Sequence, residues 1–246
     1  MKKINDLKIK IFSDGANLKE MIEMNKKDML EMSSKTFVKG LTTNPSLIKK
    51  AGVKDYEAFA KDILSTIKKK PISFEVFSDD FSEMEKQAID ISGWGHNVYA
   101  KIPITNTKRE SSIPLIENLA KKNIKLNITA IMTLEQVKSV VSVLNHDTPS
   151  IISVFAGRIA DTGRDPIPVM KESLNIMKTN TKSELLWASS RELLNIFQAE
   201  EIGCHIITVT KEIISKLKFI DYDLSEYSLD TVKGFYKDAL DAKFKI

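Results

Sequence analysis

The chain carries eight short apolar stretches, separated by turn-forming or helical patterns. Within each stretch the apolar residues run together or alternate, which is typical of buried β-strands. The stretches cover residues 9–12, 36–41, 72–77, 98–105, 125–132, 151–156, 185–189 and 205–210. Apolar residues recur at helical spacing over 18–32, 56–67, 84–91 and 113–119, and Thr133 with Gln136 forms a capping-box pattern. The alternation predicts strand–helix units with parallel strands.

Eight such units favour a closed barrel over an open sheet. The length of 246 residues suits a (β/α)8 TIM barrel, which needs about 250 residues. An open dinucleotide-binding sheet would carry a glycine-rich turn after its first strand, and residues 14–17 read Asp-Gly-Ala-Asn instead. We therefore expect one α/β domain over residues 1–246. Residues 225–246 are expected to add an amphipathic C-terminal helix that packs on the barrel or on a neighbouring subunit.

Polar residues gather at the carboxyl ends of the predicted strands. This end of a TIM barrel carries the chemistry, because loops from several strands meet there. Each polar residue alone has an ordinary structural explanation, such as an Asx turn or a strand-end ion pair. Their concentration at one end favours a site. The residues are Asp14, Thr42, Asn44, Glu75, Lys101, Asn127, Thr129, Ser153, Arg158, Ser189 and Arg191.

Lys101 lies inside the apolar stretch 98–105 and is the strongest single candidate for chemistry. Lysine is almost never fully buried without a reason. Removing an ammonium from water lowers its pKa, and the neutral amine can attack a carbonyl to form a Schiff base. Alternatively, the aliphatic stem of Lys101 packs in the strand while its amine reaches solvent.

Composition narrows the class of protein. Hydrophobic residues make up 42% and charged residues 28%, as in globular proteins with a full core. The net charge of +4 is spread without a long basic run, so a nucleic-acid partner is not expected. No apolar stretch reaches the roughly 20 residues of a membrane span, and no secretory signal is evident, so we expect a cytoplasmic protein without membrane association.

Cysteine and histidine do not indicate a metal site. The single cysteine, Cys204, excludes an intramolecular disulfide and is expected in the core. His96, His146 and His205 come before or at the start of strands, at the end of the barrel opposite the polar residues. They cannot easily meet as metal ligands there.

Several motifs together resemble the transaldolase family, which includes the fructose-6-phosphate aldolases. They are residues 40–46 (Gly-Leu-Thr-Thr-Asn-Pro-Ser), 99–103 (Tyr-Ala-Lys-Ile-Pro), 127–129 (Asn-Ile-Thr), 153–158 (Ser-Val-Phe-Ala-Gly-Arg) and 188–191 (Ala-Ser-Ser-Arg). The resemblance implies a class I aldolase mechanism that needs neither a metal nor another cofactor. It further implies a homo-oligomer whose last helix packs on a neighbouring subunit.

The resemblance also implies catalytic roles for four residues. Lys101 matches the lysine that forms the Schiff base, and Asp14 matches the acid and base that serves the C4 hydroxyl during carbon–carbon cleavage. Glu75 and Thr129 match the pair that holds a proton-relaying water. The catalytic set implied by the resemblance therefore comes from strands one, three, four and five.

Further residues match substrate-binding groups of the family. Asn44 and Asn127 match residues that bind the donor hydroxyls and the dihydroxyacetone carbons, and Thr42 supports that wall. Phe155 is assigned to the same substrate-binding surface. The remaining four match the groups that bind the substrate phosphate: Ser153, Arg158, Ser189 and Arg191.

Two positions separate transfer from cleavage within the family. Aldolases tend to carry glutamine and tyrosine where this chain has Glu75 and Phe155, so the resemblance favours a transaldolase of the pentose phosphate pathway. It implies transfer of dihydroxyacetone from fructose 6-phosphate or sedoheptulose 7-phosphate to an aldose phosphate. Val154, Ser190 and Arg164 depart from the family pattern, which keeps two alternatives open: aldolase-type cleavage, and a modified sugar such as a sulfonated one.

Two hypotheses of other classes remain beside the enzyme. A barrel of this kind can bind a metabolite without catalysis, in which case borohydride would trap no ketose on Lys101. The C-terminal amphipathic helix could instead serve an assembly protein, in which case deleting the residues after Leu224 would change the oligomer.

Overall fold

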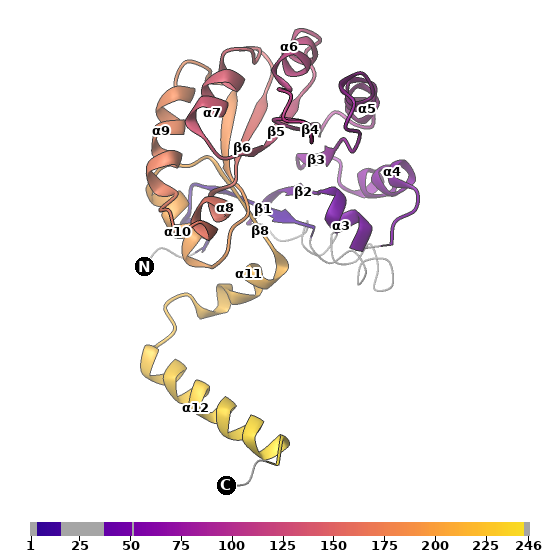
Figure 1. The fold of residues 1–246 in the computed structure, drawn as a ribbon. Coiled ribbons are helices and arrows are strands. Elements are labelled where there is room, and N and C mark those ends of the chain that lie inside the picture. The colour runs from indigo at the N-terminus through magenta and orange to yellow at the C-terminus, as the bar shows by residue number, and fades with distance from the viewer. Residues whose placement is uncertain (1–3, 16–36, 51, 244–246) are drawn as a thin grey trace.

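Eight parallel strands close into a barrel in the computed structural model, which describes residues 4–15, 37–50 and 52–243 (Figure 1). Each strand pairs with its sequence neighbours, and β1 closes the barrel against β8. The predicted TIM barrel is confirmed. The strands are β1 (Lys10–Asp14), β2 (Val38–Thr42), β3 (Ile72–Glu75), β4 (Val98–Pro103), β5 (Leu126–Ile131), β6 (Ser150–Val154), β7 (Ser183–Trp187) and β8 (Ile206–Val209).

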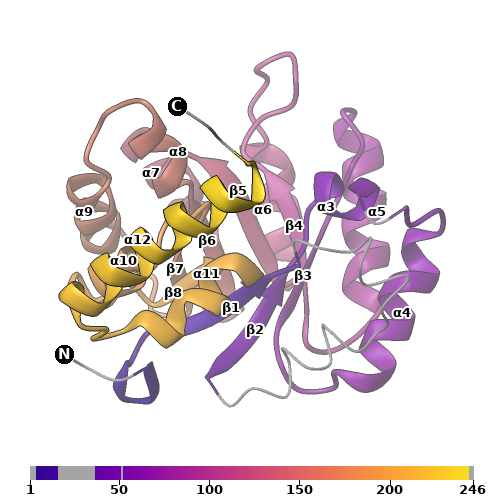
Figure 2. The same cartoon turned by 90° about the horizontal axis from the view of Figure 1, so that it is seen from below.

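Helices surround the barrel, as strand–helix alternation requires (Figure 2). They are α3 (Pro45–Lys50), α4 (Tyr56–Thr66), α5 (Phe81–Gly93), α6 (Ile113–Lys121), α7 (Leu134–Val141), α8 (Ala156–Asp161), α9 (Ile167–Met177), α10 (Leu194–Glu201), α11 (Lys211–Ser215) and α12 (Leu224–Asp241), with 3-10 turns η1 (Ile4–Asp6) and η2 (Lys216–Phe219). The capping box at Thr133 and Gln136 is confirmed. The helix expected over residues 18–32 lies outside the described residues.

Some predicted strands were too long at their carboxyl ends. The stretch 151–156 stops being a strand at Val154, because Phe155 is the N-cap of α8 and Ala156 begins that helix. The stretch 72–77 ends at Glu75, and Phe77 beyond it is 64% exposed. In both places apolar residues continue past the strand into the loops that form the rim of the barrel.

Large side chains fill the barrel interior below the rim. Phe12, Ile151, Leu186, Ala188 and Ile206 form one buried cluster there. The Phe12 ring fits because β2 carries Gly40 opposite it; a Cβ at that position would lie 2.5 Å from the ring. Such a filled interior is typical of this fold and leaves only the rim for a ligand.

Cys204 and His205 occupy structural positions. Cys204 is buried as expected, and burial raises the pKa of its thiol to about 12. His205 accepts a hydrogen bond from the Leu185 backbone N–H through Nδ1, at 2.9 Å. Over residues 4–15, 37–50 and 52–243, no group of three or more His, Cys, Asp or Glu side chains could hold a metal ion.

The last helix, α12, projects away from the barrel (Figure 1). Asp223 caps its first turn, and Tyr227 stacks on Phe219 at 5.1 Å, but none of its residues is buried. Its apolar side chains are exposed: Leu224, Tyr227, Leu229, Val232, Phe235, Tyr236 and Leu240. Within the described part of the chain, no helix combines the length and the apolar character that a membrane span needs.

Candidate active site

A cavity of about 640 Å³ opens at the carboxyl ends of the strands. Every residue in the predicted site except Asn127 lines it. The lining residues are Asp14, Thr42, Asn44, Pro45, Ser46, Glu75, Lys101, Thr129, Ala130, Ser153, Phe155, Arg158, Leu186, Ala188, Ser189, Arg191 and Thr208. The cavity is large enough for a sugar phosphate, and it combines carboxylate, amine, hydroxyl and guanidinium groups from all eight strands or the loops that follow them.

Lys101 projects into this cavity from the middle of β4 with only 7% of its surface exposed. Its Nζ lies 2.8 Å from Glu75 Oε2 and donates to the Thr43 carbonyl at 3.0 Å. Register explains the pairing, because Glu75 and Lys101 are direct neighbours across β3 and β4. The amine is therefore buried and paired, and the alternative of a packed stem with a solvated amine is wrong.

Asp14 ends β1 on the opposite side of the cavity from β5. Burial raises the pKa of its carboxyl, and the nearby Lys101 ammonium and the Thr42 hydroxyl partly oppose that shift. Thr42 Oγ1 donates to Asp14 Oδ1 at 3.0 Å and lies 2.7 Å from Thr208 Oγ1. A buried carboxyl with a raised pKa can hold or release a proton nearer neutral pH than an ordinary aspartate can.

Thr129 is brought to the cavity by an irregularity in β5. The register between β5 and β6 shifts between Ile128 and Ile131, and Ala130 adopts a left-handed φ of 62°. The Thr129 hydroxyl is buried and has no hydrogen-bond partner among the described residues. Buried hydroxyls are normally paired, so this one is suited to meet a group that enters the cavity.

Asn127 lies beneath the cavity rather than on its wall. Its side chain is fully buried, donates to Ser73 Oγ at 2.9 Å and accepts from Ser153 Oγ at 2.7 Å. These bonds connect β3, β5 and β6 below the amine of Lys101. In this structure Asn127 braces the floor and orients Ser153, which does line the cavity.

The two cavity arginines come from α8 and the loop after β7. These segments approach closely at Gly157, where a Cβ would lie 1.6 Å from the Ser189 carbonyl oxygen. Ser189 itself adopts a left-handed φ of 62°. Only glycine permits this contact, and it brings Arg158, Ser189 and Arg191 to the same end of the cavity.

The arginine end already contains one exposed carboxylate. Arg191 donates to Asp161 Oδ1 through Nε at 3.0 Å and pairs with the second oxygen through Nη2. The hydrogen bond from Arg191 lowers the pKa of Asp161. Arg158 stacks 5.9 Å from the centre of the Phe155 ring. Arg164, in the loop after α8, bonds to Thr162 and does not line the cavity.

Four supporting polar residues were missed by the sequence interpretation. Thr43, Ser73, Ser190 and Thr208 make hydrogen bonds that connect the strands below the site. Thr208 sits inside the apolar run of β8, which is the same signal that identified Lys101. Ser190, noted only as a departure, donates to the Thr208 carbonyl at 2.8 Å and connects the ends of β7 and β8.

Fold and cavity together define a class of protein: a (β/α)8 barrel with a buried lysine and carboxylates at its carboxyl-end mouth. Residues 11–246 match the family model described as transaldolase/fructose-6-phosphate aldolase. The chain belongs to this family. The match supports an enzyme of the transaldolase/fructose-6-phosphate aldolase family.

Curated relatives cover most of the chain. It is 30% identical over 210 residues to a probable transaldolase of Dehalococcoides mccartyi, covering 85% of this chain and 90% of the relative. It is 29% identical over 232 residues to a probable transaldolase of a Thermoanaerobacter species, with 94% and 98% covered. A probable transaldolase of Clostridium kluyveri is 31% identical over 210 residues, with 85% and 89% covered.

Solved structures show the same fold at low sequence identity. The 3-hexulose-6-phosphate synthase of Salmonella typhimurium superposes with a TM-score of 0.55 at 14% identity, covering 85% of this chain and 91% of that one. The tryptophan synthase alpha subunit of Campylobacter jejuni gives 0.56 at 14% identity, with 86% and 90% covered. These likenesses support the TIM-barrel architecture alone.

Proposed function

We propose that this protein is a transaldolase that transfers a dihydroxyacetone unit between sugar phosphates through a Schiff base on Lys101. The observation that carries the proposal is the buried Lys101 amine, 2.8 Å from Glu75, at the mouth of a barrel of the transaldolase/fructose-6-phosphate aldolase family. A buried primary amine beside a carboxylate is the arrangement that class I aldol chemistry uses. Fructose 6-phosphate or sedoheptulose 7-phosphate would be the donor.

In the proposed reaction the Lys101 amine first gives up a proton. Glu75 accepts it, and Thr129 presents a hydroxyl for the water that moves protons around the amine. The neutral amine attacks the C2 carbonyl of the donor, and loss of one water leaves a protonated imine. Asp14 then takes the C4 hydroxyl proton while the C3–C4 bond breaks. The electron pair of that bond enters the imine as an enamine, so no free carbanion forms.

The second half runs these steps in reverse with a different aldehyde. The enamine attacks the acceptor carbonyl, Asp14 returns its proton to the new alkoxide, and water releases the ketose from Lys101. The water that left during imine formation is consumed here, so the reaction is balanced. Asp14 must act as a base in one half and as an acid in the other, which its raised pKa supports.

The phosphate group is assigned to the arginine end of the cavity. Ser153, Ser189, Arg158 and Arg191 line the cavity there, and guanidinium groups bind phosphate in bidentate geometry. Asn44 is proposed to contact donor hydroxyls, and Asn127 to orient Ser153 beneath them. With these substrates, the natural place for the enzyme is the pentose phosphate pathway of the cytoplasm.

Product analysis tests the proposed function. With fructose 6-phosphate and erythrose 4-phosphate, we expect sedoheptulose 7-phosphate and glyceraldehyde 3-phosphate in equal amounts, measured by mass spectrometry. Free fructose should be about 100-fold poorer as a donor because it lacks the charge that the arginines bind. Release of free dihydroxyacetone without an acceptor would instead indicate aldolase-type cleavage. No turnover with any ketose phosphate or sulfonated ketose would contradict the enzyme proposal.

We also propose that α12 packs on a second copy of this chain. Its large apolar side chains are exposed in the single chain, and an apolar helix face of this size normally has a partner. Deleting the residues after Leu224 should lower the oligomer mass measured by light scattering, while borohydride still traps the donor on Lys101. An unchanged mass would contradict the role of α12 in assembly.

A further inference from the structure

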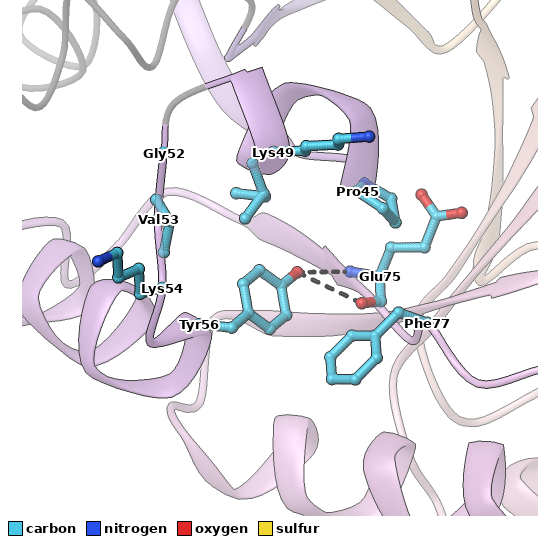
Figure 3. A pocket seen from close by; sticks show the side chains of 9 residues that line it. Pro45, Lys49, Gly52, Val53, Lys54, Tyr56, Glu75 and Phe77 are labelled. Atoms are coloured by element: carbon cyan, nitrogen blue, oxygen red, sulfur yellow. Dashed lines mark hydrogen bonds between the residues drawn. The ribbon is translucent and has the colours of Figure 1, made fainter.

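A second pocket of about 440 Å³ lies directly beside the active-site cavity (Figure 3). The two hollows share Pro45 and Glu75 as a common wall. On the far side of this wall stands Tyr56, the first residue of α4, which no proposed catalytic step uses. Figure 3 shows its hydroxyl directed at the main chain of Glu75, while the Glu75 carboxylate extends past Pro45.

The Tyr56 hydroxyl bonds twice to the main chain of Glu75. It accepts from the Glu75 N–H at 3.1 Å and donates to the Glu75 carbonyl at 3.3 Å. Glu75 needs these two bonds because strand pairing does not reach it on the β2 side. β2 ends at Thr42, so the paired register between β2 and β3 stops at Thr42 and Ser73. The main chain of Glu75 lies beyond that ladder, and buried backbone groups require a partner.

The ring of Tyr56 is held on several sides. It packs edge-on against Phe74 at 6.1 Å, Phe77 at 5.8 Å and Trp94 at 5.7 Å. Burial raises the pKa of its hydroxyl to about 12, so the phenol keeps the proton that it donates to Glu75. A rigid ring with a protonated hydroxyl fixes the position of whatever main chain it binds.

Glu75 in turn meets the amine that the proposed reaction uses. The main chain held by Tyr56 carries the carboxylate that lies 2.8 Å from Lys101 Nζ. Displacements of about 1 Å in such an arrangement can lower a rate about 100-fold. We propose that Tyr56 is a positioning residue: by clamping both backbone groups of Glu75, it holds the Glu75 carboxylate against the Lys101 amine for imine formation. The inference rests on the transaldolase proposed above.

Removing only the hydroxyl gives the first test. In Tyr56→Phe, the rate of imine formation should fall about tenfold. This rate is measured by rapid mixing of the enzyme with fructose 6-phosphate and borohydride. The inhibition constant of inorganic phosphate should stay within about twofold, because the arginine end is untouched. Tyr99→Phe removes the hydroxyl of another half-buried tyrosine, on β4 beside Lys125, and should match the wild type in both measurements.

Chemical rescue gives the second test, because Tyr56 borders an open pocket. In Tyr56→Ala the 440 Å³ pocket enlarges toward Glu75, and phenol can enter it from solvent. We expect phenol to restore a large part of the imine-formation rate, whereas benzene of similar size should not. Rescue by benzene equal to that by phenol would show that the ring only fills space and would overturn the inference.

The outcomes separate the two proposals. If the wild type traps the donor and Tyr56→Phe traps it at the same rate, the positioning role is wrong and the transaldolase proposal stands. Equal losses of imine formation and phosphate binding in Tyr56→Phe, with a lowered melting temperature, would also overturn the positioning role in favour of a general structural one. If the wild type traps no ketose phosphate or ketose sulfonate at all, the proposed function fails and this inference fails with it.

Discussion

Replacing Lys101 with methionine is expected to lower the transfer rate by at least about 10⁴-fold, because Lys101 carries the only amine among the described residues that line the cavity. Methionine keeps the length of the side chain and fills the same space in β4. Intact mass after incubation with fructose 6-phosphate and borohydride should show a reduced three-carbon adduct on the wild type. The adduct should diminish when erythrose 4-phosphate is present and should be absent from Lys101→Met.

Controls for this variant follow from the ion pair that it breaks. Loss of Lys101 leaves the Glu75 carboxylate, only 15% exposed, without its cation, and breaking a buried pair of this kind costs about 3 kcal/mol. Lys101→Arg restores a cation beside Glu75 but cannot form an imine, so it should also be inactive. Lys125→Met, at the opposite end of the barrel, should trap normally. An adduct on Lys101→Met would show that another amine carries the chemistry.

The barrel and most of its site could be predicted because both are repeated along the chain. Each strand is a short apolar run, and each functional side chain interrupts or ends such a run, as Glu75 and Lys101 do. Parallel strands in one barrel bring these ends together whatever the loop lengths. Local pattern therefore fixed both the fold and the end of the barrel at which the residues meet.

Partners across the barrel could not be predicted in the same way. Tyr56 belongs to a helix face where an aromatic residue is ordinary, and only the early end of β2 gives its hydroxyl a role at Glu75. Thr208 and Thr42 are separated by 166 positions, yet their hydroxyls are 2.7 Å apart because β8 and β2 both flank β1. Such pairings depend on closure of the barrel, and a short stretch of sequence does not show which distant strands closure brings together.

Backbone strain at the rim was also invisible to the sequence pattern. Ala130 and Ser189 adopt left-handed conformations that alanine and serine disfavour, and both line the cavity. Tertiary contacts hold them there, such as the close approach of Gly157 to the Ser189 carbonyl. The strain aims side chains into the cavity that a regular strand end would direct elsewhere.

Replacing Asp14 with asparagine is expected to lower the transfer rate by about 10³-fold while leaving imine formation intact. Asparagine still accepts the Thr42 hydrogen bond through its oxygen, but it cannot take the C4 hydroxyl proton. Carbon–carbon cleavage would stop after the imine has formed. Borohydride should therefore trap the whole six-carbon donor on Lys101 in Asp14→Asn, where the wild type gives the three-carbon adduct. A three-carbon adduct in the variant would contradict this role for Asp14.

The same substitution should stabilise the fold at neutral pH. Because burial raises the pKa of Asp14 above its usual 3.8, the native state favours the protonated carboxyl. The contribution of the Asp14 carboxyl to the stability of the fold is fully present below pH 3.8 and is lost as pH rises through the native-state pKa. Asparagine stays neutral at every pH. The stability of Asp14→Asn relative to wild type, from urea unfolding, should therefore increase with pH through this window and then level off.

Asp79→Asn provides a control of opposite sign. Hydrogen bonds from the Thr107 backbone and hydroxyl lower the pKa of Asp79 in the native state. The ionised carboxylate therefore stabilises the native state at pH values above the usual pKa. That stabilisation is lost as pH falls through the native-state pKa, so the asparagine variant should be less stable than wild type at neutral pH. If both variants shifted in the same direction, burial would not be what controls Asp14. Opposite shifts would instead show that this fold gives up stability to keep the Asp14 carboxyl buried near Lys101.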